Sequence, residues 1–271
     1  MSQTESFSKY DDLEKKRTLD LLRIINEEDK KVPIIISKSL KSIKIFINEV
    51  YTRMKKGGRL FYIGSGTPGR LGIVDASECP PTFGVNNNII IGIIAGGDSA
   101  IRNSIEGAED NIEKGWQDLK TYNISSSDSV LGVTSSGRTP YVVGALENCN
   151  KNNIYTGLLT SNNDTIAEKY AVSIIRTLVG PEVVTGSTRM KSGTAQKLIL
   201  NMISTSLMIK MGRVKGNKMV DMQLSNSKLI KRGERFLQDE LGIDLVDASK
   251  LLERSNTVRE AINLYKKKSL D

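Results

Sequence analysis

Apolar positions along this chain follow two different spacings. Between residues 13 and 54 they recur every three or four positions, as in amphipathic helices, with one segment expected to end near Pro33 and a second to run through Val50. Short apolar runs then replace this pattern at residues 60–63, 89–95, 130–133, 154–159 and 172–175. Most of these runs precede a loop rich in glycine, serine and threonine and then a helical pattern, so we expect βαβ units and a parallel sheet.

The last part of the chain returns to helical spacing. A strong apolar stripe runs from Ser192 to Met211, and after Gly233 the pattern is helical again. We therefore expect an α/β protein with N-terminal helices and a small C-terminal helical appendage. The expected divisions are 1–54 for a helical segment packing on the core, 55–215 for the α/β domain, and 216–271 for a connector and a short helical region.

The composition removes several kinds of chemistry. The 271 residues include no histidine, so neither a Ser-His-Asp triad nor a Cys-His pair can form within the chain. Zinc sites that use histidine are excluded too, and only Cys79 and Cys149 remain as thiolate ligands. Acid–base catalysis would fall to carboxylates, lysine, tyrosine or cysteine, and carboxylate chemistry without a metal is the first alternative to consider.

The charge of the chain points to an anionic partner without specifying one. The formal net charge of +8 fits nucleic acid, a membrane surface, a phosphorylated metabolite or simply a basic solvated surface. The basic residues are scattered and only 5% of residues are aromatic, so we do not expect nucleic-acid binding. No apolar run suits a signal peptide or a membrane span, and two cysteines form no disulfide framework, so we expect a cytoplasmic protein.

The first glycine-rich loop follows the run at 60–63. Gly64–Gly69 reads GSGTPG and matches the dinucleotide pattern G-x-G-x-x-G, but the acidic residue expected about 20 positions later is missing. A phosphate or sugar site is favoured over nicotinamide, and a plain tight turn between strand and helix is the alternative. Ser65 and Thr67 supply hydroxyls, and Pro68 is expected to be the first residue of a helix whose N-terminus would bind an anion.

Two further loops have the same character. The second reads TSSGRTP and ends at Pro140, again a helix-starting proline, and the third reads TGSTRMKSGT. Their hydroxyls include Thr134, Ser135, Ser136 and Thr139 in the second loop, and Ser187 and Thr188 in the third. Arg189 and Lys191 add cations that could neutralise a phosphate or carboxylate, although exposed charges near a capping Ser192 would give the same pattern.

Two glutamates are candidates for acid–base work. Glu78 lies in DASECPPT, where the two prolines are expected to end the helix and hold Glu78 at a rigid corner near the first loop. Glu109 lies in IEGAED, and spacing does not exclude its neighbours Glu106 and Asp110. A pair of carboxylates can take a proton from carbon and give one to a leaving oxygen. By spacing alone, any one of these glutamates is more often a surface residue.

Long stretches of the chain carry a family resemblance. They are LFYIGSGTPGRLGIVDASECPPTFGV (60–85), IGIIAGGDSAIRNSIEGAEDN (91–111), SSGRTPYVVGAL (135–146), GPEVVTGSTRMKSGTAQKLILNMISTSLMIK (180–210), INEEDKKVP (25–33) and GNKMVDMQLSNSKL (216–229). Over nearly the whole chain they resemble the N-acetylmuramic acid 6-phosphate etherases. These belong to the sugar isomerase (SIS) domain proteins, with a doubly wound α/β fold of mainly parallel strands, and glucokinase regulatory protein is a non-catalytic relative.

The resemblance implies a reaction and a set of roles. N-acetylmuramate 6-phosphate and water would give N-acetylglucosamine 6-phosphate and D-lactate, by elimination and then hydration, in recycling of cell-wall sugar and without a cofactor. The family glutamates fall on Glu78, which would donate the proton to the ether oxygen, and on Glu109, the partner base. Thr134, Ser135, Ser136 and Thr139 would hold the phosphate, while Ser187, Thr188, Arg189 and Lys191 would line the rest of the site. The implied assembly is a homodimer with its site near the subunit boundary.

Two departures from the family pattern matter. The family usually has serine where this chain has Pro68, which lacks both a hydroxyl and a backbone N–H, so weaker affinity or an altered substrate range is expected. The helical tail is also shorter than the family's. Two other functions therefore stay open: a non-catalytic sensor of sugar phosphates, and an aldose–ketose isomerase on the same fold.

Overall fold

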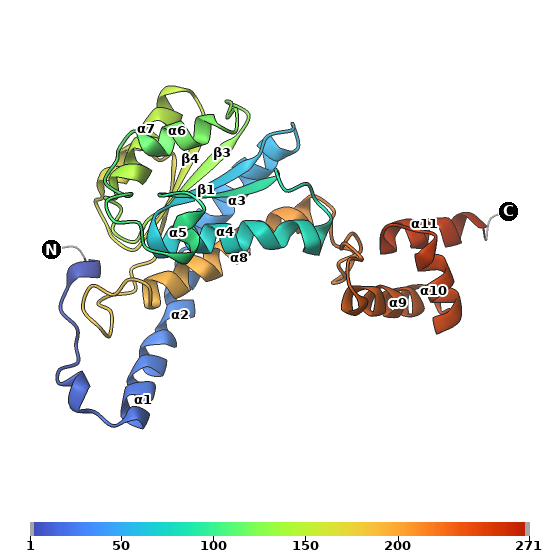
Figure 1. Ribbon diagram of the computed structural model, residues 1–271, viewed down its shortest axis with the longest axis horizontal. Coiled ribbons are helices and arrows are strands. Elements are labelled where there is room, and N and C mark those ends of the chain that lie inside the picture. The colour runs from blue at the N-terminus through green and yellow to red at the C-terminus, as the bar shows by residue number, and fades with distance from the viewer. Residues whose placement is uncertain (1–2, 269–271) are drawn as a thin grey trace. The chain divides into compact units, whose positions relative to one another are not determined.

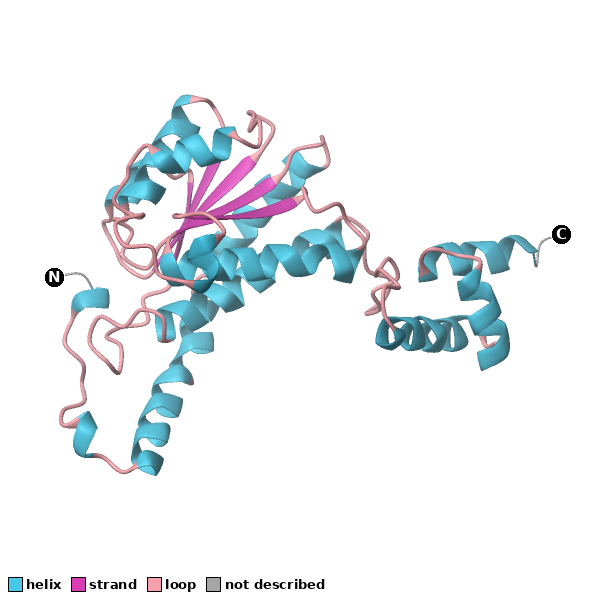
Figure 2. Ribbon diagram, viewed as in Figure 1, coloured by secondary structure: helices cyan, strands magenta, loops and turns pink. Residues whose placement is uncertain are grey.

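Five parallel strands form one sheet in the computed structural model, which describes residues 3–268 (Figures 1 and 2). They are β1 (Leu60–Gly64), β2 (Ile90–Ile94), β3 (Ser129–Val133), β4 (Tyr155–Thr160) and β5 (Ser173–Arg176). The order across the sheet is β2-β1-β3-β4-β5, and every neighbouring pair is parallel. The five apolar runs are thus confirmed as strands. β1, β3 and β4 are buried along their whole length, as in a sheet covered on both faces.

Helices account for most of the rest of the chain. The α-helices are α1 (Thr18–Asp29), α2 (Lys31–Ser37), α3 (Leu40–Met54), α4 (Gly66–Phe83), α5 (Ser99–Arg102), α6 (Lys114–Lys120), α7 (Pro140–Lys151), α8 (Lys191–Lys210), α9 (Ser227–Leu241), α10 (Leu245–Glu253) and α11 (Val258–Lys268). Three short 3-10 helices are η1 (Gln3–Glu5), η2 (Leu13–Lys15) and η3 (Ile166–Tyr170). Among residues 3–268, no helix has both the length and the apolar character that a bilayer span requires.

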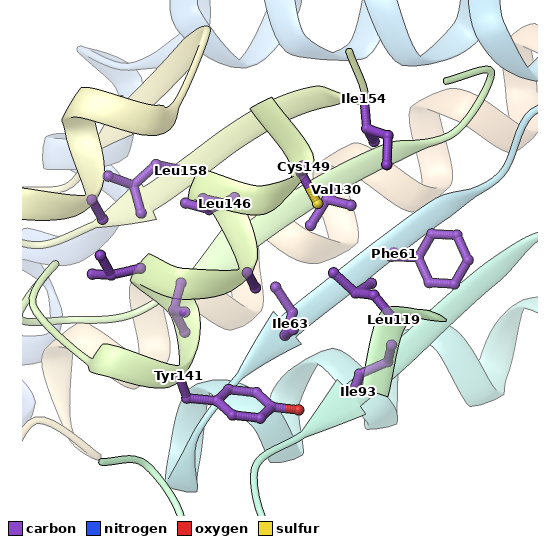
Figure 3. Packing of buried hydrophobic residues seen from close by; sticks show 14 of the residues in the cluster. Phe61, Ile63, Ile93, Leu119, Val130, Tyr141, Leu146, Cys149, Ile154 and Leu158 are labelled. Atoms are coloured by element: carbon purple, nitrogen blue, oxygen red, sulfur yellow. The ribbon is translucent and has the colours of Figure 1, made fainter. Parts of the chain in front are cut away.

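The helices cover both faces of the sheet. Phe61 and Ile63 of β1 point to one face and pack with α6 and α7 in a buried apolar cluster, shown in Figure 3. Tyr62 points to the other face, where a Cβ placed on Gly72 of α4 would lie 3.0 Å from the Tyr62 Cβ. On that same face, α3 packs so closely on β4 that a Cβ on Gly157 would collide with the Phe46 ring. The arrangement is the expected doubly wound fold.

The strand order creates a switch point between β1 and β3. The chain crosses from β1 to β2 in one direction and then returns past β1 to build β3, β4 and β5 on the other side. The loops that leave β1 and β3 therefore part toward opposite faces, and ligands of open α/β sheets bind in the crevice between such loops. Both hydroxyl-rich loops predicted from the sequence stand at this position.

The N-terminal helices differ in one respect from the prediction. α1 ends at Asp29, and Pro33 lies in the first turn of a separate helix, α2. This is a position where a helix does not need the N–H that proline lacks. The sequence predicts that a helix ends near Pro33, whereas Pro33 lies in the first turn of the next helix.

A larger difference concerns α4. The helix begins at Gly66, before Pro68, and continues through Pro80 and Pro81 to Phe83. The two prolines remove two backbone donors near the end of the helix, but Gly84 N still donates to Pro80 O at 2.9 Å and closes the last turn. The expectation that the prolines end the helix and form a corner at Glu78 was wrong, because Glu78 lies within a continuous helix.

The chain divides into two compact units. The first comprises Met1–Ser77 and Asn88–Ser204 and contains the sheet, and the second comprises Glu78–Asn87 and Thr205–Asp271. In the second unit α9, α10 and α11 bury a small core of their own, which includes Leu237, Leu252 and Ala261. Gly233 lies inside α9 rather than before it. A Cβ at this position would lie 3.0 Å from the Leu252 side chain, so glycine permits the close packing of α9 and α10.

Candidate functional site

Three loops of the first unit come together at the carboxyl ends of the strands. We call them loop one (Gly64–Gly69), loop two (Thr134–Thr139) and loop three (Thr185–Met190). Loops one and two leave strands that are hydrogen-bonded neighbours. Loop one meets the start of α8, which follows loop three, because a Cβ on Gly193 would lie 3.3 Å from Thr67 Cγ2. Loop two meets the same helix through a hydrogen bond of 3.0 Å from Gln196 Nε2 to Ser135 Oγ.

Loop one is a tight junction whose glycines are sterically required. A Cβ on Gly64 would lie 2.8 Å from the backbone nitrogen of Gly69 and 3.0 Å from the Val133 carbonyl oxygen. The glycines therefore let β1, β3 and the start of α4 approach one another. Ser65 and Thr67 are partly exposed beside this junction. Pro68 is the third residue of α4, in the first turn, where backbone N–H groups are otherwise free to bind a ligand.

Loop two is shaped by its own hydroxyl groups. The buried Thr134 hydroxyl accepts a hydrogen bond from Gly137 N at 3.2 Å and lies 2.9 Å from Thr139 Oγ1. Ser136 Oγ accepts from Arg138 N at 3.1 Å. Pro140 is the first residue of α7, as predicted. Because a hydroxyl has one donor and two acceptor positions, these side chains can hold the loop and still bind an anion.

Ser135 and Asn162 connect loop two to the end of β4. Ser135 is buried, and its carbonyl oxygen accepts hydrogen bonds from Asn162 Nδ2 at 2.9 Å and from Thr160 Oγ1 at 3.2 Å. Asn162 is 2% exposed. The sequence pattern does not indicate Asn162 as a site residue, because an asparagine after a strand is equally typical of an ordinary turn.

Loop three and the first residue of α8 present fewer exposed cations than the sequence predicts. Lys191, expected to face the substrate, has its ammonium 2.7 Å from Glu28 Oε2 and also donates to the Val179 carbonyl at 3.0 Å. Its side chain is only 2% exposed. The Lys191 charge, at the first residue of α8, is thus neutralised inside the protein, while Arg189 of loop three is exposed. Spacing alone could not reveal a partner that lies far away in the chain.

Glu28 collects three donors at this buried pair. Besides Lys191, Lys31 Nζ donates to its carboxylate, and so does the Tyr10 hydroxyl at 2.9 Å. Burial raises the pKa of Glu28, but the hydrogen bonds from Lys191, Lys31 and Tyr10 outweigh it and lower the pKa from 4.5 to about 2. Glu28 is therefore ionised at neutral pH. The charge pair ties α1 to the start of α8.

Glu182 caps the N-terminus of α8. Its carboxylate accepts from the backbone N–H groups of Lys191 and Ser192, each at 2.9 Å, and from Ser192 Oγ at 2.9 Å, and the residue is 1% exposed. Ser192 was considered as a cap, but it donates to the carboxylate that provides the cap. The helix end after loop three thus already holds an anion of the chain itself. A lone glutamate in the apolar stretch GPEVV was the sequence signal.

Glu109 lies beside loop two. Its carbonyl oxygen accepts a hydrogen bond of 3.0 Å from the backbone N–H of Tyr141, two residues after Thr139, and its side chain is exposed. The segment that contains Glu109 also packs on α7, because the Ile112 carbonyl oxygen would collide with a Cβ placed on Gly144. Among the described residues, Glu106 and Asp110 have no such bond to α7. This backbone hydrogen bond holds the main chain of Glu109 at the start of α7.

Glu78 is placed differently. It is exposed on α4, on the same helical face as Val74, which is 58% exposed. Glu78 is the first residue of the second compact unit, whereas the three loops belong to the first unit.

The thiols offer no second catalytic group. Cys149 is fully buried in the cluster beneath α7 (Figure 3), and burial raises its pKa to about 12. Cys79 is also buried. Within residues 3–268, no three cysteine, aspartate or glutamate side chains gather as a metal site would require.

Comparison with known sequences gives a consistent set of relatives. Residues 42–150 match the family described as the glucokinase regulatory protein N-terminal SIS domain. The chain is 52% identical over 97% of its length to an N-acetylmuramic acid 6-phosphate etherase of Bacteroides fragilis, 94% of which is covered. It is 53% identical over 98% of its length to that of Porphyromonas gingivalis, 97% covered, and 54% identical over 87% to that of Caldanaerobacter subterraneus subsp. tengcongensis, 78% covered.

Solved structures share the fold at low sequence identity. A putative phosphosugar isomerase involved in capsule formation from Bacteroides fragilis aligns with a TM-score of 0.58 at 15% identity, over 74% of this chain and 95% of that one. A phosphoheptose isomerase from Francisella tularensis aligns with a TM-score of 0.57 at 15% identity, over 71% and 98%. At such identity the likeness establishes the sugar isomerase fold.

Proposed function

The chain belongs to the N-acetylmuramic acid 6-phosphate etherase family, and we propose that it cleaves the D-lactyl ether of N-acetylmuramate 6-phosphate. The products are N-acetylglucosamine 6-phosphate and D-lactate. The observation that carries this proposal is the identity of 52% over 97% of the chain to an etherase. The three loops at the switch point support it, because they supply hydroxyl groups and a cation suited to an anionic sugar.

The proposed mechanism uses two glutamates and needs no metal or cofactor. In the open-chain sugar the aldehyde at C1 acidifies the proton on C2, and the Glu109 carboxylate removes it. Glu78, protonated, gives its proton to the ether oxygen as the C3–O bond breaks, so D-lactate leaves and a C2–C3 double bond remains. Water then adds across that bond, with hydroxyl to C3 and hydrogen to C2. The exposure of both side chains supports these roles, because each is open to a ligand.

Loop two is the proposed phosphate site, and loops one and three are proposed to bind the rest of the substrate. Ser65 and Thr67 would contact the sugar from loop one, while Ser187, Thr188 and Arg189 would do so from loop three. Lys191 is proposed to act without contacting the substrate, because its ion pair with Glu28 holds the start of α8 in place. Arg189 then supplies the exposed positive charge of loop three.

We propose that the active form is a cytoplasmic homodimer with a shared site. Glu78 stands on an exposed face of α4 together with the exposed Val74, and it lies outside the unit that carries the three loops. A second copy that covers this face would bury Val74 and bring its own loops to Glu78. Each site would then take Glu78 from one subunit and Glu109 from the other.

A lactate-release assay tests the function. Purified protein is incubated with N-acetylmuramate 6-phosphate, and D-lactate is measured with a coupled dehydrogenase. Glu78→Gln and Glu109→Gln are expected to reduce turnover by about 100-fold or more, while Glu106→Gln, in the same loop as Glu109, retains it. Glu106→Gln is thus the matched control for loss of a charge.

The same assay separates the two alternative functions. A protein that binds the sugar phosphate and releases no lactate would be a sensor. The match of residues 42–150 to the glucokinase regulatory protein N-terminal SIS domain is the observation that favours this alternative. Conversion of an aldose phosphate to its ketose without lactate release would identify an isomerase. Either outcome would overturn the etherase proposal.

A further inference from the structure

The N-terminal segment Gln3–Tyr10 is fastened directly to the candidate site. Thr4 N donates to Asn162 Oδ1 at 3.2 Å, and Asn162 Nδ2 donates to Thr4 Oγ1 at 2.9 Å. Both residues are buried, at 1% and 2% exposure. The same Asn162 amide donates to the Ser135 carbonyl of loop two. The start of the chain is thus anchored to the loop proposed to bind phosphate.

A second anchor fastens the segment to loop three. Ser8 N donates to Thr185 Oγ1 at 2.9 Å, and Ser8 Oγ donates to the Val183 carbonyl at 2.6 Å. Further on, the Tyr10 hydroxyl donates to Glu28, the partner of Lys191. Hydrogen bonds on both sides therefore fix the residues between Thr4 and Ser8.

Glu5 lies between these two anchors, at the end of η1. Its side chain is exposed, and a Cβ placed on Gly186 of loop three would lie 3.7 Å from Glu5 Oε2. Gly186 has a backbone φ of +74°, which disfavours any other residue there. A negative charge is thereby held against a loop that otherwise presents hydroxyls and the Arg189 cation.

Such a carboxylate suits a particular part of the substrate. An ionised glutamate only accepts hydrogen bonds, so it would repel the phosphate and the lactyl carboxylate. The sugar carries donors of its own, its hydroxyl groups and its acetamido N–H. These donors need an acceptor, and an ionised carboxylate is a stronger acceptor than the hydroxyl groups of the loops.

We propose that Glu5 binds substrate, by accepting a hydrogen bond from an O–H or N–H of the amino sugar while the anchors at Thr4 and Ser8 hold it over loop three. This inference rests on the proposed function of the site. The N-terminal segment would then line the site together with the three loops. Glu5 would recognise the sugar rather than the phosphate.

The test compares Glu5→Gln with Glu14→Gln, an exposed glutamate of the neighbouring η2. Three quantities are measured: KM for N-acetylmuramate 6-phosphate, Kd for N-acetylglucosamine 6-phosphate, and Ki for inorganic phosphate as a competitor. Glu5→Gln is expected to raise KM and Kd about tenfold and to leave the phosphate Ki unchanged. Glu14→Gln should change none of them.

Two results would overturn the proposal. An unchanged Kd in Glu5→Gln would show that Glu5 does not contact the sugar, and a rise in the phosphate Ki equal to that in Kd would show a general disturbance of the loops. If the unmodified protein binds both sugar phosphates but releases no lactate, the proposed function fails, whereas the two binding constants still test Glu5.

Thr4→Val provides an independent check, because it removes one of the two hydrogen bonds of the first anchor and leaves Glu5 in place. It is expected to raise Kd for the sugar phosphate by a smaller factor than Glu5→Gln. Combined with Glu5→Gln it should add nothing, since the anchor acts through the carboxylate. Additive losses in the double variant would contradict that role of the anchor.

Discussion

At the scale of single residues, the buried pair between Glu28 and Lys191 joins distant parts of the first unit. Its two charges are 2.7 Å apart and almost fully removed from water. Desolvation makes such a pair costly to form, but removing one partner is costlier, because the other charge stays buried without compensation. The pair therefore matters less for net stability than for holding α1 and the start of α8 in one arrangement.

Lys191→Met is expected to lower the free energy of unfolding by about 2–3 kcal/mol, since the Glu28 carboxylate loses its buried partner but keeps the hydrogen bonds from Lys31 and Tyr10. Denaturant unfolding at neutral pH measures the loss. Lys197→Met, an exposed lysine of the same helix, is the control and should change stability by about 0.5 kcal/mol or less. Equal effects of the two substitutions would contradict the structural role of the pair.

The same pair predicts how stability depends on pH. The folded protein lowers the pKa of Glu28 from 4.5 to about 2, so the ionised form is favoured by folding. This contribution, about 3 kcal/mol at most, is fully present above pH 4.5 and is lost as the pH falls toward 2. The difference in unfolding free energy between the unmodified protein and Glu28→Gln should therefore be constant above pH 5 and shrink below 4.5. A difference that grows in acid would contradict the assignment.

Pro68→Ser restores the hydroxyl and the N–H that the family usually has in loop one. We expect KM for N-acetylmuramate 6-phosphate to fall about threefold to tenfold, the effect of one added hydrogen bond. Stability should fall by about 0.5–1 kcal/mol, because serine leaves the unfolded chain more freedom. Pro33→Ser on α2 is the control, with a similar loss of stability and an unchanged KM. An unchanged KM in Pro68→Ser would mean that this position makes no contact with substrate.

At the scale of secondary structure, α8 is the element on which the loops depend. Loop three leads into it, loop two bonds to it through Gln196, and loop one touches it at Gly193. Its N-terminus is held by the buried carboxylate of Glu182, which satisfies two backbone donors and complements the helix dipole. A helix fixed in this way keeps the three loops in register.

Glu182→Gln is therefore expected to cost about 1–2 kcal/mol of stability, because an amide provides fewer acceptors and no charge at the helix end. Thermal unfolding measures the loss. Glu147→Gln, which removes a surface partner of Lys151 on α7, should cost about 0.5 kcal/mol or less. If Glu182→Gln is as mild as this control, the cap does not hold α8.

At the scale of the whole molecule, the open question is which chain supplies each glutamate. The backbone of Glu109 is bound to the start of α7 in the first unit, and Glu78 belongs to the second unit, on a helical face with an exposed valine. The proposed shared site follows from these positions. It makes a prediction that sites within single chains would not share.

Glu78→Gln and Glu109→Gln, each inactive alone, should regain activity when they are mixed and allowed to exchange subunits. Half of the dimers would then be mixed, and each mixed dimer would contain one site with both native glutamates. Lactate release should recover to about a quarter of that of the unmodified protein. No recovery, despite subunit exchange confirmed by mass spectrometry, would place both glutamates of a site in one chain.

The sequence by itself determined the local architecture and the kind of chemistry. Five apolar runs became strands, the loops fell at strand ends, and the lack of histidine directed attention to carboxylates. These features depend on burial periodicity and composition, which are local properties of the chain. Where local signals competed, at Pro80 and Pro81, the predicted helix end was wrong because a neighbouring hydrogen bond closes the last turn of α4.

Only the tertiary structure decided which groups meet. It joined Lys191 to Glu28, 163 residues away, placed Glu182 under α8, and set Glu5 over Gly186. It also ordered the strands so that loops one and two flank a switch point. Such contacts connect segments whose separation along the chain carries no periodic signal. Their partners are chosen by packing and by the need of each buried charge for a counter-charge, which no spacing of residues records.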